Sequence, residues 1–152
     1  MRTAPPVYLS GQLGQPVRSS DGARVGRVID LTVLYDIAHP IVHRLAVGRS
    51  RRILYLLPWS LVATYGDEQV VLAVDRMGLS TYASSRDPTL EDRELLLARD
   101  VLDTQIVDLA GRRLSRVSDV IMVAGSERRL EVAAVDGGCW LAVAPDGIAP
   151  AR

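Results

Sequence analysis

The stretch LGQPVRSSDGARVGRVIDL, residues 13–31, decides how this chain is interpreted, because it returns 89 positions later as LDTQIVDLAGRRLSRVSDV, residues 102–120. The identical pairs within these 19 positions are Leu13 and Leu102, Gly22 and Gly111, Arg24 and Arg113, Arg27 and Arg116, Val28 and Val117, and Asp30 and Asp119. Chance would supply about one such identity, so the sequence predicts two diverged copies of one small unit.

The first copy has the pattern of a meander of short strands. Asp21-Gly22 is a hairpin turn signal, because glycine accepts a positive φ. A long strand is expected from Arg24 to Tyr35, and the three-residue spacing of Val25 and Val28 within it predicts a β-bulge near Gly26. Further strands are expected at residues 41–47, 52–57, 61–65 and 69–74, and this spacing is typical of a small barrel or sandwich.

The second copy repeats only part of this pattern. Strands are expected at residues 104–108, 113–123, 129–136 and 139–144, but nothing corresponds to residues 61–74 of the first copy. Because an open sheet edge invites unwanted pairing, another segment should cover it. The candidates are Val7-Tyr8-Leu9, the first copy, or a second chain.

The segment between the copies predicts a short helix. Asp87-Pro88 resembles a helix start, with acidic residues in the next turn. Leucines at positions 90, 95, 96 and 97 form a short apolar stripe. A helix from about Pro88 to Ala98, packed on one of the two units, is therefore expected.

Composition excludes several classes of function. The 152 residues carry 18 basic and 18 acidic side chains, so no overall charge draws the chain to nucleic acid or to anionic lipid. A single cysteine, Cys139, excludes an internal disulfide and favours a reducing compartment. The sequence has neither a signal-peptide pattern nor an apolar run of membrane-spanning length, and we therefore expect a cytoplasmic protein. We expect no cofactor.

The first copy resembles the PRC-barrel domain family over about residues 9–75. The resemblance rests on Gly14-Gln15-Pro16-Val17, Asp21-Gly22, Val25-Gly26-Arg27-Val28-Ile29-Asp30, Pro40 with Val42 and Leu45, and Leu57-Pro58-Trp59 with Val62. The second copy, residues 100–147, resembles the same domain more faintly, and Asp146 stands where the first copy has its tryptophan.

The resemblance implies a mainly β protein with two small antiparallel PRC-like β-barrels, joined by a linker at residues 76–99 that holds one short helix. It also implies no enzymatic activity. Members of the family dock on other proteins, as in the cytoplasmic subunit of photosynthetic reaction centres and in a ribosome maturation factor.

The expected function is therefore a non-catalytic interaction or regulatory module that docks on a protein complex. Its partner would be a protein, and a membrane complex or a second copy of this chain are the alternatives, the latter because the second barrel is incomplete. The second copy also resembles tandem-barrel proteins associated with MgtE-type magnesium transporters. A regulatory domain linked to magnesium transport and a ribosome-maturation-type factor thus remain alternatives.

Four residues are candidate partner contacts. The basic turn that holds Arg49, Arg51 and Arg52 could contact phosphate or an acidic partner, whereas the alternative is a solvated hairpin tip. Trp59 would be a binding hot spot if it were exposed, whereas the alternative is packing in the core.

The other candidate residues have structural explanations. The repeat places Asp30 with Asp119 and Arg27 with Arg116, which predicts either a symmetric acidic site or a strand-end hydrogen bond within each barrel. His39 and His43 have the spacing of a helical metal pair, but they lie in an expected strand. We assign no catalytic residue and no metal ligand.

Overall fold

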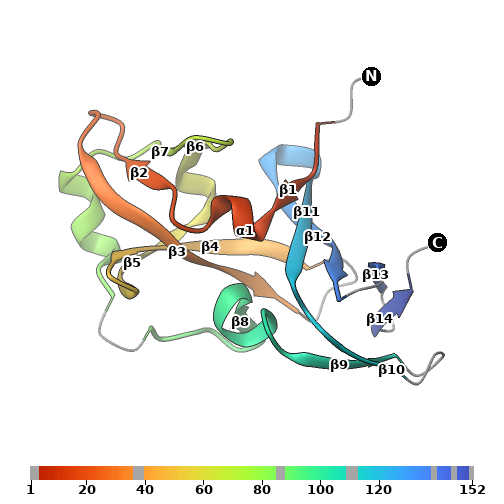
Figure 1. Ribbon diagram of the computed structural model, residues 1–152. Coiled ribbons are helices and arrows are strands. Elements are labelled where there is room, and N and C mark those ends of the chain that lie inside the picture. The colour runs from red at the N-terminus through yellow and green to blue at the C-terminus, as the bar shows by residue number, and fades with distance from the viewer. Residues whose placement is uncertain are drawn as a thin grey trace.

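The computed structural model describes residues 4–35, 40–84, 88–108, 113–137, 140–144 and 147–150. The fold is mainly β (Figure 1). The first unit contains β2 (Pro16–Arg18), β3 (Arg24–Leu34), β4 (Ile41–Arg49), β5 (Arg52–Pro58), β6 (Val62–Thr64) and β7 (Val70–Leu72). The second unit contains β9 (Gln105–Asp108), β10 (Arg113–Arg116), β11 (Asp119–Ala124), β12 (Leu130–Asp136), β13 (Trp140–Ala144) and β14 (Gly147–Pro150).

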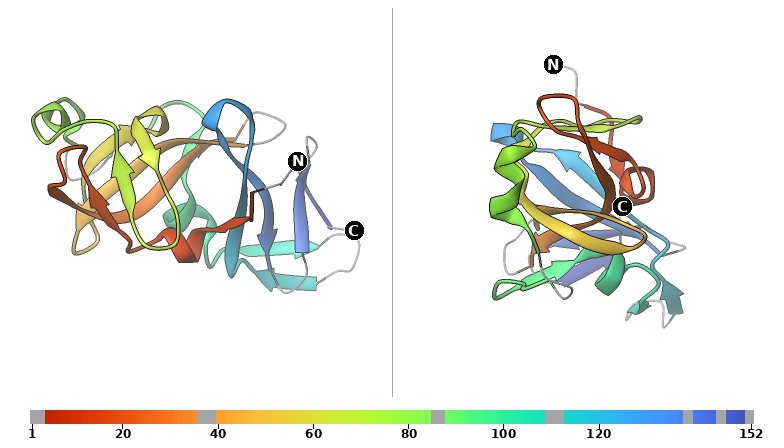
Figure 2. Two further views of the ribbon diagram at one scale, coloured as in Figure 1. Left: turned by 90° about the horizontal axis from the view of Figure 1, so that it is seen from above. Right: turned by 90° about the vertical axis from the view of Figure 1, so that its left-hand side faces the viewer.

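The sheet of the first unit curls into a half-barrel, which the right-hand view of Figure 2 shows end-on. Two bulges in β3 contribute to this curl, since bulges increase local twist. Val25 is extra where β3 pairs with β2, and Ile29 is extra where β3 pairs with β4. The first confirms the bulge that the sequence predicts near Gly26. The second shifts the register immediately before Asp30.

The repeat is visible in the register of the strands. In the first unit Pro16 pairs with Arg27, and in the second unit Gln105 pairs with Arg116, which are the same positions after a shift of 89. The hairpin of β9 and β10 therefore corresponds to β2 and the start of β3. The repeated sequence thus encodes a repeated backbone.

The two units share one sheet, apart from β9 and β10, which form a two-stranded sheet of their own. Ile41 of β4 pairs with Glu131 of β12, and the strand order runs β1-β11-β12-β4-β3-β2-β7-β6, with β8 also on β3. Two separate, purely antiparallel barrels are thus not confirmed, because the sheet is continuous and Val17 of β2 pairs with Val70 of β7 in parallel.

Two short arms precede the units and are exchanged between them. Arm 1 consists of β1 (Val7–Tyr8) and α1 (Leu9–Gln12), and it pairs with β11 of the second unit. Arm 2 consists of β8 (Glu94–Leu96) and the π-helical turn Leu97–Val101, and it pairs with β3 of the first unit. Figure 1 shows both arms near the junction of the units. Each unit therefore receives the arm that precedes the other.

The N-terminal segment covers one edge of the second unit, because Val7 pairs with Met122 of β11, and β4 of the first unit pairs with β12. The edge that β7 covers in the first unit is that of β2, and its counterpart β9 pairs only with β10 among the described strands. Leu95 pairs with Val33 in the equivalent position, because Val33 and Met122 are 89 residues apart.

The expected helix from Pro88 to Ala98 is wrong. Residues 94–96 form a strand instead, and a π-helical turn begins at Leu97. Helical propensity is a weak prior that tertiary pairing overrides. Here β3 offers a free edge to Glu94–Leu96, and the Glu94 side chain is buried against that edge.

One hydrophobic core spans both units and both arms. Leu9 of arm 1 is 0% exposed and Leu97 of arm 2 is 3% exposed, although both lie in short turns. Their neighbours in the same cluster are Val17, Val28, Leu31, Leu45, Val47, Leu57, Val117, Val120, Met122, Leu130 and Val132. The arms therefore anchor the two units through equivalent leucines.

We expect Leu9→Ala and Leu97→Ala each to lower the free energy of unfolding by about 2–5 kcal/mol, because each leaves a cavity in the shared core. Leu114→Ala is the control, since Leu114 is 72% exposed and should change stability by no more than about 0.5 kcal/mol. Urea denaturation measures all three. Losses at Leu9 and Leu97 no larger than at Leu114 would contradict the anchoring role.

Candidate functional site

Asp30 is a buried carboxylate that binds arm 2. The bulge at Ile29 precedes it, and only 3% of the residue is exposed. Its Oδ1 accepts hydrogen bonds from the backbone N–H of Leu31 at 2.8 Å and of Ala98 at 2.7 Å, and its Oδ2 accepts one from Arg99 N–H at 3.0 Å. The carboxylate therefore satisfies backbone donors at the start of the π-helical turn.

Asp119 does the same for arm 1. Its Oδ1 accepts hydrogen bonds from the backbone N–H of Val120 at 2.8 Å and of Ser10 at 3.0 Å, and its Oδ2 accepts one from the Ser10 hydroxyl at 2.5 Å. The strand register makes Ser10 the counterpart of Ala98, because Val7 and Leu95 pair with the equivalent residues Met122 and Val33, and both N–H groups donate to the Oδ1 atom of their aspartate. The two aspartates thus form a reciprocal latch, in which each unit holds the arm that precedes the other.

The latch corrects one of the two explanations offered for these aspartates. They do make structural hydrogen bonds, but besides the local bonds to Leu31 and Val120 each aspartate binds the arm that precedes the other unit. Equivalent backbone bonds close each turn onto its own unit: Gly14 N–H donates to Val28 O at 2.8 Å, and Asp103 N–H donates to Val117 O at 2.9 Å.

The repeated arginines do not join the aspartates in one site. Arg27 is exposed, and its Nη1 donates to Gly14 O at 2.7 Å. Arg116 is exposed at the end of β10. Within the described part of the chain, no three His, Cys, Asp or Glu side chains lie close enough to hold a metal ion.

The candidate histidine pair cannot be judged as a pair. His39 and Cys139 lie outside the described residues. His43 lies on β4, and its Nε2 is 3.0 Å from Glu91 Oε2. His43 is therefore engaged with a neighbouring acid on the surface.

A second buried carboxylate, Glu94, escaped the sequence analysis. Its Oε2 accepts hydrogen bonds from Thr32 Oγ1 at 2.5 Å and Arg44 Nε at 2.8 Å, and its Oε1 also contacts Arg44 Nη2. The second copy has no arginine at this place: Ala134 lies opposite Ile121 as Arg44 lies opposite Thr32, so the repeat gives no signal for this pair. The ion pair fastens β8 to β3 and β4.

The net pKa shifts of the two buried carboxylates have opposite signs. Burial raises the pKa of Asp30 above its ordinary value, and the three backbone hydrogen bonds oppose that rise only partly. Burial also disfavours the charge of Glu94, but the Arg44 guanidinium and the Thr32 hydroxyl outweigh it, so the pKa of Glu94 is lowered. The two groups should therefore respond to acid with opposite signs.

Asp30→Asn should destabilise the fold by about 1–3 kcal/mol, because the new amide group faces Arg99 N–H and leaves a buried donor unpaired. Asp119→Asn should cost less, about 0.5–1.5 kcal/mol, since that side is half-buried. Asp92→Asn is the control, because the Asp92 side chain is 97% exposed. Chemical denaturation at neutral pH measures all three, and equal effects at Asp30 and Asp92 would contradict the latch.

The pH dependence of stability separates Asp30 from Glu94. Because the pKa of Asp30 is raised in the folded protein, its titration adds to the free energy of unfolding. This addition is complete below pH 3.8 and is lost as the pH rises through the pKa of the folded state. Because the pKa of Glu94 is lowered, its contribution is present above pH 4.5 and is lost as the pH falls through the folded pKa. Urea titrations at several pH values measure how the free energy of unfolding falls from neutral to acidic pH. Compared with wild type, this fall should be smaller in Glu94→Gln and larger in Asp30→Asn. The reverse order would contradict both assignments.

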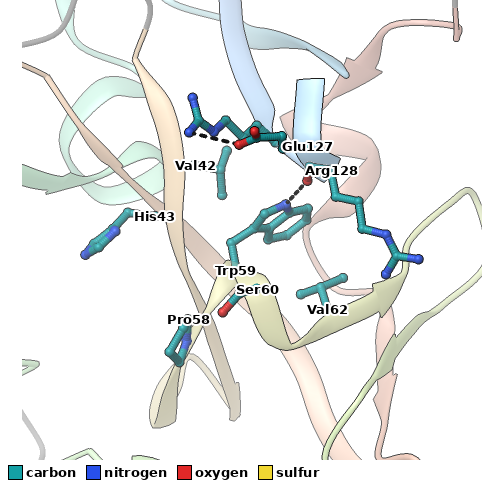
Figure 3. A pocket seen from close by; sticks show the side chains of 9 residues that line it. Val42, His43, Pro58, Trp59, Ser60, Val62, Glu127 and Arg128 are labelled. Carbon is teal, nitrogen blue, oxygen red and sulfur yellow. Dashed lines mark hydrogen bonds and ion pairs between the residues drawn. The ribbon is translucent and has the colours of Figure 1, made fainter. Parts of the chain in front are cut away.

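Trp59 is a core residue that joins the two units. It is 9% exposed, its ring centroid lies 5.3 Å from that of Tyr65, and its Nε1 donates to Arg128 O at 3.3 Å. Figure 3 shows this bond reaching the loop before β12, with His43 pointing away from the indole. An open cavity of about 430 Å³ lies beside it. The hot-spot interpretation, which needs an exposed indole, does not hold.

The basic turn is part of a larger arginine surface. Ser50 and Arg51 form the two-residue turn between β4 and β5, and both have a positive φ, 50° and 65°. Arg49 and Arg52 flank the turn and are exposed. Arg49 also lines a cleft of about 440 Å³ together with Arg24, Gly26, Arg27, Gly48 and Ser50. We call this the arginine cleft.

Arg51→Gly should raise the free energy of unfolding by about 0.5 kcal/mol, because glycine adopts a positive φ without the strain that a side chain imposes. Arg52→Gly is the control, since Arg52 lies within β5 and glycine weakens a strand. Thermal and urea unfolding measure both variants. A loss of stability in Arg51→Gly as large as that in Arg52→Gly would contradict the turn geometry.

Comparisons with known proteins add no relative. No protein-family model matches the chain, and a search of curated proteins finds no match either. Over the described residues, no helix has the length and apolar character needed to cross a membrane. Inferences about function therefore rest on the chain's own residues.

Proposed function

We propose that this protein is a non-catalytic interaction module of the PRC-barrel kind, which docks on a protein complex through the first unit. The observation that supports the proposal most directly is the set of exposed arginines on the hairpins β2–β3 and β4–β5: Arg18, Arg24, Arg27, Arg49, Arg51 and Arg52. Arginine is enriched at protein interfaces, where its planar guanidinium makes paired hydrogen bonds.

Several arginines elsewhere in the chain are paired: Arg44, Arg99 and Arg129 each lie within 4 Å of a carboxylate. Among the described residues, no carboxylate forms an ion pair with any of the six arginines of the two hairpins. Their charge is therefore uncompensated within that part of the chain and available to a partner.

The rest of the fold supports docking by holding this surface still. The hairpins belong to the half-barrel, and the reciprocal latch fixes that half-barrel to the second unit. A rigid binding surface loses little conformational entropy on association. Arg27, anchored to Gly14 O, is ordered before any partner binds.

Affinity capture from an extract of the source organism tests the proposal. Wild-type protein should retain a specific partner, and Arg51→Glu with Arg52→Glu should reduce the recovered partner at least tenfold by reversing charge at the turn. Arg128→Glu with Arg129→Glu is the control, because it makes the same charge change in the loop between β11 and β12. Equal recovery with all three proteins, confirmed on the purified partner, would contradict docking through this turn.

A further inference from the structure

Resting on this proposed function, we infer that the arginine cleft binds carboxylates of an acidic segment in the partner protein. The cleft lies where β3 pairs with β4. Three of its six lining residues are arginines, and the remaining three are Gly26, Gly48 and Ser50. Cationic groups thus surround a space that small residues leave open.

Close backbone approach keeps the floor of the cleft free of side chains. A Cβ atom at Gly26 would lie 2.7 Å from Gly48 O, and one at Gly48 would collide with the Arg52 carbonyl. Neither position accepts a larger residue without moving the strands. The opening is therefore fixed by the pairing of β3, β4 and β5 and does not depend on the rotamers of exposed side chains.

The charges around this space match a carboxylate. Arg24, Arg27 and Arg49 are exposed, and guanidinium groups bind carboxylates through two parallel hydrogen bonds. The Arg27 guanidinium is fixed by its hydrogen bond to Gly14 O, whereas among the described residues the guanidinium groups of Arg24 and Arg49 have no hydrogen-bond partner. Two guanidiniums beside a third that is anchored can therefore engage neighbouring acidic side chains of one peptide segment.

Other anionic partners fit the cleft less well. Single-stranded nucleic acid needs aromatic side chains for base stacking, and no aromatic residue lines the cleft. Binding to a membrane surface uses apolar side chains beside basic ones. The large apolar side chains exposed in the described residues are Tyr8, Tyr35, Met77 and Leu114, none of which lines the cleft.

Fluorescence anisotropy with a labelled octaglutamate peptide tests the assignment. Wild-type protein should bind octaglutamate and should not bind octaglutamine. The affinity for octaglutamate should fall as salt is raised from 50 to 300 mM, because salt screens exposed charges over a Debye length of about 10 Å at 0.1 M. Arg24→Gln with Arg49→Gln should weaken binding at least tenfold. Arg128→Gln with Arg129→Gln is the charge-matched control and should bind as wild type does.

The outcomes separate this inference from the proposed function. No saturable binding of octaglutamate, or equal binding by the cleft variant and the control, overturns the acidic-segment assignment even if partner capture succeeds. Tighter binding of a DNA oligonucleotide or of phosphatidylserine vesicles that the cleft variant abolishes overturns the choice of a protein partner. If affinity capture recovers no specific partner while octaglutamate binds at the cleft, docking through the turn is overturned and the carboxylate site at the cleft stands.

Discussion

The buried Asp30 carboxylate, with three backbone N–H groups around it, is the interaction on which the architecture depends. A buried charge is costly unless it is hydrogen-bonded, and Asp30 meets that condition only when arm 2 brings the N–H groups of Ala98 and Arg99 to it. Removing either partner would leave the other unsatisfied. The site therefore specifies where residues 94–101 must lie and draws β8 onto the free edge of β3.

Because Asp119 repeats this arrangement with Ser10, the chain has the organisation of a symmetric dimer within one polypeptide. In a two-fold interface the same contact is made twice with the roles exchanged, and the order β1-β11-β12-β4-β3-β8 has that symmetry when equivalent strands are compared. Units of this size bury little surface alone. Exchanging the arms joins their cores through Leu9 and Leu97.

Sequence alone could predict the features that lie within one repeat, including the bulge near Gly26 and the β-rich meander, because local spacing encodes them. It also singled out Asp30 and Asp119, since the repeat aligns them. The partners of these aspartates are 68 and 109 residues away, so no local pattern identifies them. The helix expected at residues 88–98 failed for a related reason: its apolar stripe and acidic start describe the segment by itself, whereas its structure is set by β3. The Arg44–Glu94 pair occurs in one copy only and left no repeated signal.

The proposed docking surface depends on this frame, because the hairpins β2–β3 and β4–β5 include the same strands, β3 and β4, that pair with arm 2 and β12. Native-state hydrogen exchange of the Ala98, Arg99 and Ser10 amides is the most direct test of the reciprocal latch. The account predicts that these amides, although they lie in short turns, open with nearly the same free energy as Leu45 and Val47 in β4, since the arms leave only when the shared core unfolds. Exchange of the three amides at a much lower free energy, with β4 still protected, would show that the arms detach independently and would contradict the account.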